Sequence, residues 1–291
     1  MELFDTHAHY NDEKFNEDRE EVIQSIYESG VTKLINAGYS LESSKKAIEI
    51  AIHYDWMHVI CGISPNDIPN NKVEIDQQIL ELERMIHNNL STKEKKREKN
   101  FTVETVDNIN KNIGITADKS QKIVAIGEIG LDYYWNKENK ELQKYAFMKQ
   151  IELAKELELP IVIHTREAVN DTIDILKNTI CPKKKGIFHC CPLNRELVKE
   201  ALKLGFYISF AGPITFKNAK NADEIIRMVP LDKMLIETDS PYLSPEPYRG
   251  KRNDSRNIHL MAEKIAKVRN LPVEEIASQT YQNAQKIFEI K

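Results

Sequence analysis

Short apolar runs alternate along the chain with longer segments in which apolar residues recur every three to four positions. The short runs predict buried strands, and the longer segments predict helices with one buried face. The predicted strands lie at residues 2–9, 31–37, 56–63, 122–127, 160–163, 186–188, 206–211 and 233–238. The predicted helices lie at residues 16–29, 40–54, 73–88, 138–158, 167–178, 195–203, 218–229, 257–269 and 273–288. This alternation predicts parallel strands with helices packed outside them.

The number of strand–helix units, about eight, is that of an α/β fold of the (β/α)₈ or TIM-barrel type, in one domain over residues 1–291. A doubly wound open sheet would also alternate, but no G-x-G-x-x-G follows the first strand and no P-loop is present. The pattern breaks after the third unit, at residues 89–122, which are rich in Lys, Glu, Asn and Thr. Because the charges there alternate in sign without interleaved aromatic residues, we interpret 89–122 as a solvated surface insertion, partly helical at 102–110, rather than a basic arm for nucleic acid.

Composition limits the classes of partner. Apolar residues make up 41% of the chain and charged residues 30%, and the net charge is −4, so no global field attracts nucleic acid or membrane. A site for phosphate must therefore be a local cationic or metal-centred feature. The four cysteines contain no C-x-x-C, no secretory segment is recognisable, and no apolar run approaches the ~20 residues of a membrane span. We expect a cytoplasmic, monomeric protein without a membrane partner.

Residues of the types that bind metals stand at the ends of the predicted strands, and barrel strand ends converge on one face. The set is His7, His9, Glu128, His164, His189 and Asp239. Imidazoles and carboxylates together suit a pair of divalent ions such as zinc, manganese or iron, and the oxygen ligands also admit magnesium. The remaining histidines are interpreted as structural: His53, His58, His87 and His259. Each member of the first set could be structural by itself, but six of them at successive strand ends favour a metal site.

Hydrolysis is the reaction class that such a site predicts. A bound divalent ion lowers the pKa of water and polarises a phosphoryl or carbonyl oxygen. Glu128, placed mid-barrel, is the natural bridge between two ions, and Asp239 is the candidate to bind one ion and accept a proton from water. Glu128 and Asp239 are thus the candidate catalytic residues. This reasoning leaves phosphoester, amide and lactone substrates open.

Several motifs carry a family resemblance. They are Asp5-Thr6-His7-Ala8-His9, Gly127-Glu128-Ile129-Gly130-Leu131-Asp132-Tyr133-Tyr134, Ile163-His164-Thr165-Arg166, Ser209-Phe210-Ala211-Gly212, Glu237-Thr238-Asp239-Ser240-Pro241 and Arg249-Gly250-Lys251-Arg252-Asn253. Together they resemble the TatD family of metal-dependent deoxyribonucleases, within the amidohydrolase-like barrels, over nearly the whole chain except the insertion. The resemblance implies a two-metal DNase that trims strands from the 3′ end, with magnesium or manganese supporting activity. By matching position, it also implies the metal ligands: His7, His9, Glu128, His164, His189 and Asp239.

The chain departs from that family pattern at two places. The family usually has Gly-x-His-Pro after the third strand, whereas this chain reads Gly62-Ile63-Ser64-Pro65. Ser64 can donate a hydrogen bond to substrate but cannot carry positive charge near neutrality. After His189 the family usually continues Cys-Phe-Ser-Gly, and this chain reads Cys190-Cys191-Pro192-Leu193, which should reshape the loop. Both changes concern substrate choice and rate rather than the metal ligands.

Local cations and aromatic rings are the candidates for DNA contact. Arg166, Arg249 and Arg252 can bind phosphate through two parallel hydrogen bonds each. Tyr133, with its neighbours Tyr134 and Trp135, either stacks on bases of a single strand or packs beneath the rim of the barrel.

Two alternatives to a deoxyribonuclease stay open. A lactonase or amidohydrolase for a small molecule can use the same barrel, although those relatives commonly bridge their metals with a modified lysine, where this chain has Glu128. A metal-binding protein without catalysis is suggested by Ser64 and the Cys191-Pro192 loop.

Overall fold

A computed structural model describes residues 1–89, 122–179 and 182–291 of the protein. Its strands are β1 (Leu3–Ala8), β2 (Val31–Ala37), β3 (Met57–Cys61), β4 (Ile123–Asp132), β5 (Ile161–Arg166), β6 (Gly186–Phe188), β7 (Tyr207–Phe210) and β8 (Met234–Ile236). The eight strands form one sheet in sequence order, and each pairs in parallel with the next. The sheet curls into a nearly closed barrel, which confirms the predicted (β/α)₈ fold.

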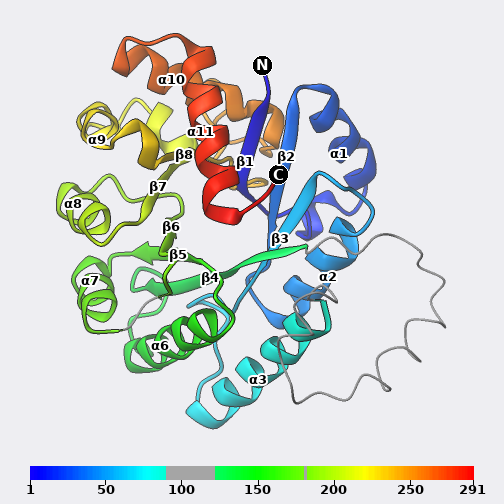
Figure 1. Cartoon of the computed structure of the whole chain (residues 1–291), viewed down its shortest axis with the longest axis vertical. Coiled ribbons are helices and arrows are strands. Elements are labelled where there is room, and N and C mark those ends of the chain that lie inside the picture. The colour runs from blue at the N-terminus through cyan, green and yellow to red at the C-terminus, as the bar shows by residue number, and fades with distance from the viewer. Residues whose placement is uncertain (90–121, 180–181) are drawn as a thin grey trace.

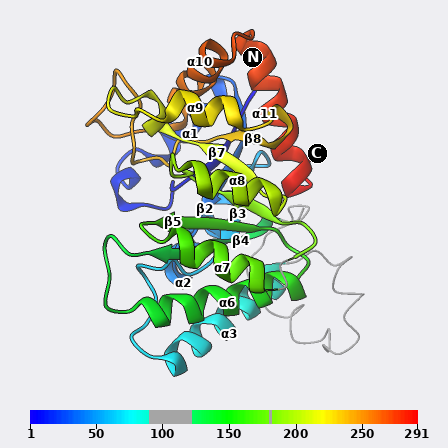
Figure 2. The same cartoon turned by 90° about the vertical axis from the view of Figure 1, so that its left-hand side faces the viewer.

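Helices surround the strands (Figure 1). They are α1 (Arg19–Glu28), α2 (Leu41–Ala51), α3 (Lys72–Asn89), α6 (Lys140–Glu156), α7 (Val169–Asn178), α8 (Arg195–Lys203), α9 (Ala222–Met228), α10 (Ile258–Arg269) and α11 (Val273–Phe288). The loops after β1, β4 and β8 project on one side of the barrel, and both termini lie on the other (Figure 2). Within the described ranges, no helix combines the length and the apolar character needed to cross a membrane.

The apolar core has two layers because neighbouring strand residues point to opposite faces of the sheet. On β2, Leu34 belongs to the layer between strands and helices, whereas Ile35 belongs to the smaller cluster inside the barrel. That inner cluster also holds Phe4 and, from the C-terminal helix α11, Phe288. The interior of the barrel is therefore filled by apolar side chains.

The fourth strand is longer than predicted. The sequence pattern places its end at Gly127, but β4 continues to Asp132, and its pairing with β5 shifts register between Ile126 and Ile129. Glu128 therefore lies within the irregular part of a strand rather than after its end. Residues 90–121 of the predicted insertion, including the helix predicted at 102–110, lie outside the described residues.

Two glycines allow β4 to approach the end of β3 closely. A Cβ atom on Gly62 would lie 2.6 Å from the carbonyl carbon of Gly127, and one on Gly127 would lie 2.7 Å from the Val162 side chain. Neither position has space for a larger residue: Gly62 packs on the backbone of β4, and Gly127 packs on the side chain of Val162 in β5. The next residue, Glu128, donates its N–H to the Gly38 carbonyl at 3.0 Å, which fixes where its side chain begins.

Two buried glutamines on α6 bind the segment after β3 and the end of β4. Gln150 accepts the N–H of Ile63 at 2.8 Å and donates to the Ile63 carbonyl at 3.0 Å. Gln143, seven residues earlier on the same helix face, does the same for Asp132, at 2.8 and 3.0 Å. Each amide thus satisfies two backbone groups that would otherwise be buried without partners.

We expect Gln150→Leu to destabilise the protein by about 2–4 kcal/mol, because it leaves the N–H and carbonyl of Ile63 unsatisfied at nearly unchanged volume. Urea unfolding followed by far-UV circular dichroism measures the change. Gln282→Leu is the matched control, since Gln282 is exposed and its side chain donates to Ser278 on its own helix. Equal unfolding midpoints for the two variants would contradict the role given to Gln150.

Candidate metal centre

The first donor group joins the beginning of the chain to its end. The Nε2 atoms of His7 and His9, from β1 and the residue after it, lie 3.3 Å apart. The Asp239 Oδ1 atom, three residues beyond β8, lies 3.2 Å from Nε2 of His9 and 3.8 Å from Nε2 of His7. All three side chains thus direct a possible ligand atom towards one point, within 4.8 Å of one another.

The second donor group comes from β4, β5 and the residue after β6. Glu128 Oε1 lies 2.9 Å from Nδ1 of His164 and 3.2 Å from Nε2 of His189. Those two ring nitrogens are 3.3 Å apart. Each of the three elements contributes one donor, as expected where strand ends converge in a barrel.

Glu128 belongs to both groups. While Oε1 faces His164 and His189, Oε2 lies 3.5 Å from Nε2 of His7 and 3.9 Å from Nε2 of His9. The Glu128 side chain is only 10% exposed. One buried carboxylate therefore presents one oxygen to each donor group.

Three of the four imidazoles are oriented by an acceptor on their far side. His9 donates from Nδ1 to the Ala37 carbonyl at 2.9 Å. His164 bonds through Nε2 to Asp132 Oδ2 at 2.9 Å, and His189 through Nδ1 to Glu237 Oε1 at 3.2 Å. With the proton on the far nitrogen, which is the tautomer these acceptors favour, the lone pair of the near nitrogen faces the centre. Metal-binding histidines are typically held this way.

Opposite charges stabilise one another inside the centre. Burial raises the pKa of Glu128, but the charge of His189 and hydrogen bonds from three imidazoles outweigh it and hold that pKa well below its ordinary value. Burial lowers the pKa of His189, yet Glu128 and Glu237 raise it well above the ordinary value. The pKa of His7 is lowered by burial and by the neighbouring His189.

The donor chemistry fits a divalent metal. Imidazole nitrogen and carboxylate oxygen are both present in each group, the donors converge, and the far sides of His9, His164 and His189 are satisfied. The structure brings together all six predicted ligands: His7, His9, Glu128, His164, His189 and Asp239. Their role as ligands stays a prediction.

A group of hydrogen bonds between β1 and the segment after β8 fixes the predicted ligand His7 relative to the predicted ligand Asp239. Asp5 accepts the N–H of Thr238 at 3.0 Å, the Thr238 hydroxyl at 2.6 Å and the Ser255 hydroxyl at 2.5 Å. Directly beside this contact, Asp239 donates its N–H to the His7 carbonyl at 2.9 Å. The buried Asp5 carboxylate therefore locks the strand that carries His7 to the turn that carries Asp239.

The predicted substrate residues have different surroundings. Arg166 is exposed, with its guanidinium carbon 3.8 Å from the ring centre of Tyr134. Arg249 is also exposed, and its guanidinium carbon lies 4.3 Å from the ring centre of Phe216. Arg252 instead forms two hydrogen bonds with Asp18, at 2.8 and 2.5 Å, so its guanidinium is engaged within the protein.

The two other predicted contacts face protein partners. Tyr133 is only 6% exposed, and its hydroxyl donates to Asp171 at 2.6 Å. Tyr133 thus packs beneath the rim, which was one of the two roles considered for it. Ser64 is buried, and its hydroxyl donates to Asp67 Oδ2 at 2.5 Å.

Sequence reasoning missed the residues that orient the ligands. Asp132 and Glu237 are fully buried carboxylates, and burial of Asp132 is outweighed by its hydrogen bond from His164, which helps lower its pKa to about 2. Both lie on or beside a strand that also carries a predicted ligand, four residues after Glu128 and two before Asp239. A second carboxylate so near a candidate ligand is the signal that could have found them.

Comparison with known proteins places this centre in a family. The sequence model of the family described as TatD related DNase matches residues 4–289. The metal-dependent hydrolase YabD of Bacillus subtilis (strain 168) is 38% identical over 288 residues, covering 99% of each chain. The metal-dependent hydrolase YcfH of Escherichia coli (strain K12) is 44% identical over 168 residues, which are 58% of this chain and 63% of YcfH.

Solved structures agree on the fold. YjjV, a TatD homologue from Escherichia coli K12, superposes with a TM-score of 0.83 at 23% identity, covering 99% of this chain and 98% of that one. A TatD-family hydrolase from Entamoeba histolytica gives a TM-score of 0.72 at 22% identity, with 99% and 98% covered. The family model spans nearly the whole chain, and its relatives share both length and sequence. The protein therefore belongs to the TatD family of metal-dependent hydrolases.

Proposed function

We propose that the protein is a two-metal deoxyribonuclease that removes nucleotides from the 3′ end of DNA strands, acting as a monomer. The observation that carries this proposal is the Glu128 carboxylate, which directs one oxygen to the His7–His9 pair and the other to the His164–His189 pair. With its two oxygens directed to different histidine pairs, Glu128 would suit two divalent ions that share one carboxylate. The ions would be magnesium, manganese or zinc. The TatD family match supports DNA as the substrate.

The ions, when bound, supply a polarised phosphoryl oxygen and an activated water. Asp239 supplies a proton acceptor. Burial raises its pKa, but the hydrogen bond and the charge of His9 outweigh burial and lower it, so the carboxylate is ionised at neutral pH. The side chain is 13% exposed and so remains accessible. Asp239 is therefore placed to take the proton of the attacking water.

Exposed arginines are proposed to hold the DNA backbone. Arg166 follows the ligand His164 by two residues on β5, and Arg249 lies in the long loop after β8. Within the part of the chain that the structure describes, neither is paired with a carboxylate. Their guanidinium groups are thus free to bind phosphate, whereas Arg252 anchors the same loop to Asp18.

Digestion of a 3′-labelled single-stranded oligonucleotide tests the proposal. We expect Asp239→Asn and Glu128→Gln each to lower turnover by at least about 100-fold, because each removes an acceptor or a shared ligand from the centre. Asp232→Asn and Glu263→Gln are matched controls at exposed positions. If wild type contains metal but leaves the oligonucleotide intact, a small-molecule ester, lactone or amide becomes the substrate to test. Equal activity in wild type and Asp239→Asn would show that the site is assigned wrongly.

Chelation of the metal should lower the melting temperature by about 5 °C or more, because ions that bind only the folded state stabilise it. Elemental analysis should find two ions per chain in wild type and in Glu263→Gln, and fewer in Glu128→Gln. Differential scanning calorimetry before and after chelation measures the melting temperature. A wild type that melts unchanged after losing its metal, or that binds one ion at saturation, would contradict a two-metal centre shared by Glu128.

Restoring a histidine at residue 64 should raise kcat/KM on DNA by about fivefold, since a charged hydrogen bond to phosphate is stronger than a neutral one. The backbone can accept this change because Ser64 is held by its own N–H, which donates to the Tyr39 carbonyl at 2.8 Å. Ser64→Ala is the control, because it removes the bond to Asp67 without adding a cation. Steady-state kinetics that are the same for Ser64→His and Ser64→Ala would exclude the predicted phosphate contact.

A further inference from the structure

Two exposed aromatic rings stand directly after β4, beside the metal centre. Trp135 is 69% exposed and Tyr134 is 46% exposed. Their ring centres lie 4.9 Å apart with planes at 85°, and the guanidinium carbon of Arg166 lies 3.8 Å from the centre of Tyr134 and 5.5 Å from that of Trp135. We call Tyr134, Trp135 and Arg166 the aromatic rim. Large rings left in water next to a cation are suited to a flat, anionic ligand.

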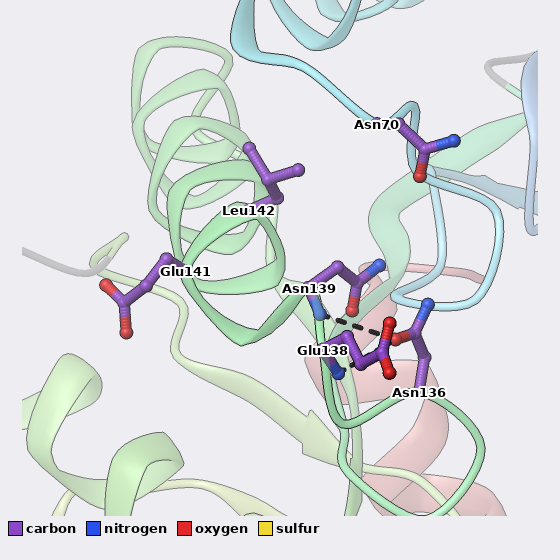
Figure 3. A pocket seen from close by; sticks show the side chains of 6 residues that line it. All are labelled: Asn70, Asn136, Glu138, Asn139, Glu141 and Leu142. Atoms are coloured by element: carbon purple, nitrogen blue, oxygen red, sulfur yellow. Dashed lines mark hydrogen bonds between the residues drawn. The ribbon is translucent and has the colours of Figure 1, made fainter.

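The backbone of the aromatic rim is rigidly built. Asp132 Oδ1 accepts the N–H groups of Tyr134 at 2.9 Å and Trp135 at 3.0 Å. Gln143 donates to the carbonyl of the next residue, Asn136, at 3.1 Å. The Asn136 side chain in turn accepts the N–H groups of Glu138 and Asn139, as Figure 3 shows. The exposed rings are therefore presented on an ordered turn, which reduces the entropy lost when a ligand binds.

The same carboxylate connects the aromatic rim to the metal centre. While Asp132 Oδ1 holds the backbone of the rim, its Oδ2 accepts the hydrogen bond of the ligand His164 at 2.9 Å. Arg166 follows His164 by two residues on β5, a separation of roughly 7 Å along a strand. The Arg166 carbonyl also accepts the N–H of Tyr133 at 2.9 Å. The backbone of the rim is thus connected both to the predicted ligand His164, through Asp132, and to the strand that carries it.

Charge indicates on which side the DNA backbone would lie. A pocket of about 290 Å³ adjoins the turn and is lined by Asn70, Asn136, Glu138, Asn139, Glu141 and Leu142 (Figure 3). Its two carboxylates repel phosphate, whereas Arg166 attracts it. Glu167 also lies near Arg166 in the chain, but Lys137 pairs with it at 3.7 Å. A strand would therefore place its phosphates at Arg166 and its base on the rings.

We propose that the aromatic rim is a stacking subsite for an unpaired nucleobase next to the bond that is cleaved. This inference rests on the proposed function and specifies its substrate class. Trp135 offers the larger and more exposed ring, while Arg166 already covers one face of Tyr134. Stacking tolerates every base because each has a π-face, so the subsite selects unpaired ends without selecting sequence. A base inside a duplex has both faces covered and cannot enter.

Kinetics of Trp135→Ala on a single-stranded oligonucleotide test the subsite. We expect KM to rise by about tenfold or more, with a smaller change in kcat, because stacking contributes to binding. Trp135→Phe should restore most of the affinity. Trp56→Phe is the matched control, since Trp56 precedes β3 and so lies at the opposite end of the barrel. An unchanged KM in Trp135→Ala would overturn the proposal.

An oligonucleotide with abasic residues at its 3′ end separates stacking from a general disturbance of the loop. Wild type should lose affinity for the abasic strand by about the factor that Trp135→Ala loses on the normal strand. The variant should then lose little more on the abasic strand. If Trp135→Ala weakens both strands equally, the ring acts on something other than the base and the proposal fails.

Fluorescence keeps this test independent of turnover. The chain has two tryptophans, so Asp239→Asn combined with Trp56→Phe leaves Trp135 as the only tryptophan, whose emission is excited selectively at the red edge of its absorption, in a slow or inactive protein. Titration with oligothymidylate should quench that emission, and abasic oligonucleotide should not. Quenching without hydrolysis by the wild type would support the subsite and overturn the nuclease proposal. Hydrolysis by the wild type without quenching would overturn the subsite alone.

Discussion

The negative charge of Glu128, buried among four imidazoles, is the constraint on which the centre depends. A carboxylate removed from water is costly unless charges and hydrogen bonds replace the solvent, and here His189, His164 and His7 replace it. No single strand could provide those partners. The barrel brings them from distant parts of the chain, and the close backbone approach at Gly62 and Gly127 places Glu128 between them. The site therefore depends on the fold, because the Glu128 carboxylate is stable as a buried anion only where the converging strands bring the imidazoles around it.

A second carboxylate, Asp5, makes the ends of the chain part of the same centre. It holds Thr238 and Ser255 through three hydrogen bonds, and this fixes His7 relative to Asp239. The first donor group can therefore form only when β8 has closed against β1. The second group is assembled within the middle of the barrel. Because Glu128 belongs to both donor groups, the complete site can form only when the whole barrel has folded.

Much of this arrangement was predictable because it follows local rules. The bounds of β2 and α11 were predicted as observed, since a short apolar run and a proline before an amphipathic segment are strong signals. The end of β4 was predicted wrongly, because in the sequence an irregular strand with glycines on both sides of Glu128 resembles a turn. Asp132 and Glu237 were also missed as partners of histidine. Their role depends on which ring nitrogen faces the centre, and only three-dimensional packing determines that.

The two departures from the family pattern both leave the support of the centre intact. At residue 64 the backbone bond to Tyr39 is independent of the side chain, while the Ser64 hydroxyl donates to Asp67 and accepts the N–H of Asn66 in the same loop. After His189, the N–H of Cys190 donates to Glu237 at 2.6 Å, and the N–H of Cys191 donates to the Ser209 carbonyl at 3.0 Å. Pro192, which has no N–H, follows these two donors and removes neither. At both places, therefore, the backbone hydrogen bonds next to the predicted metal centre remain in place.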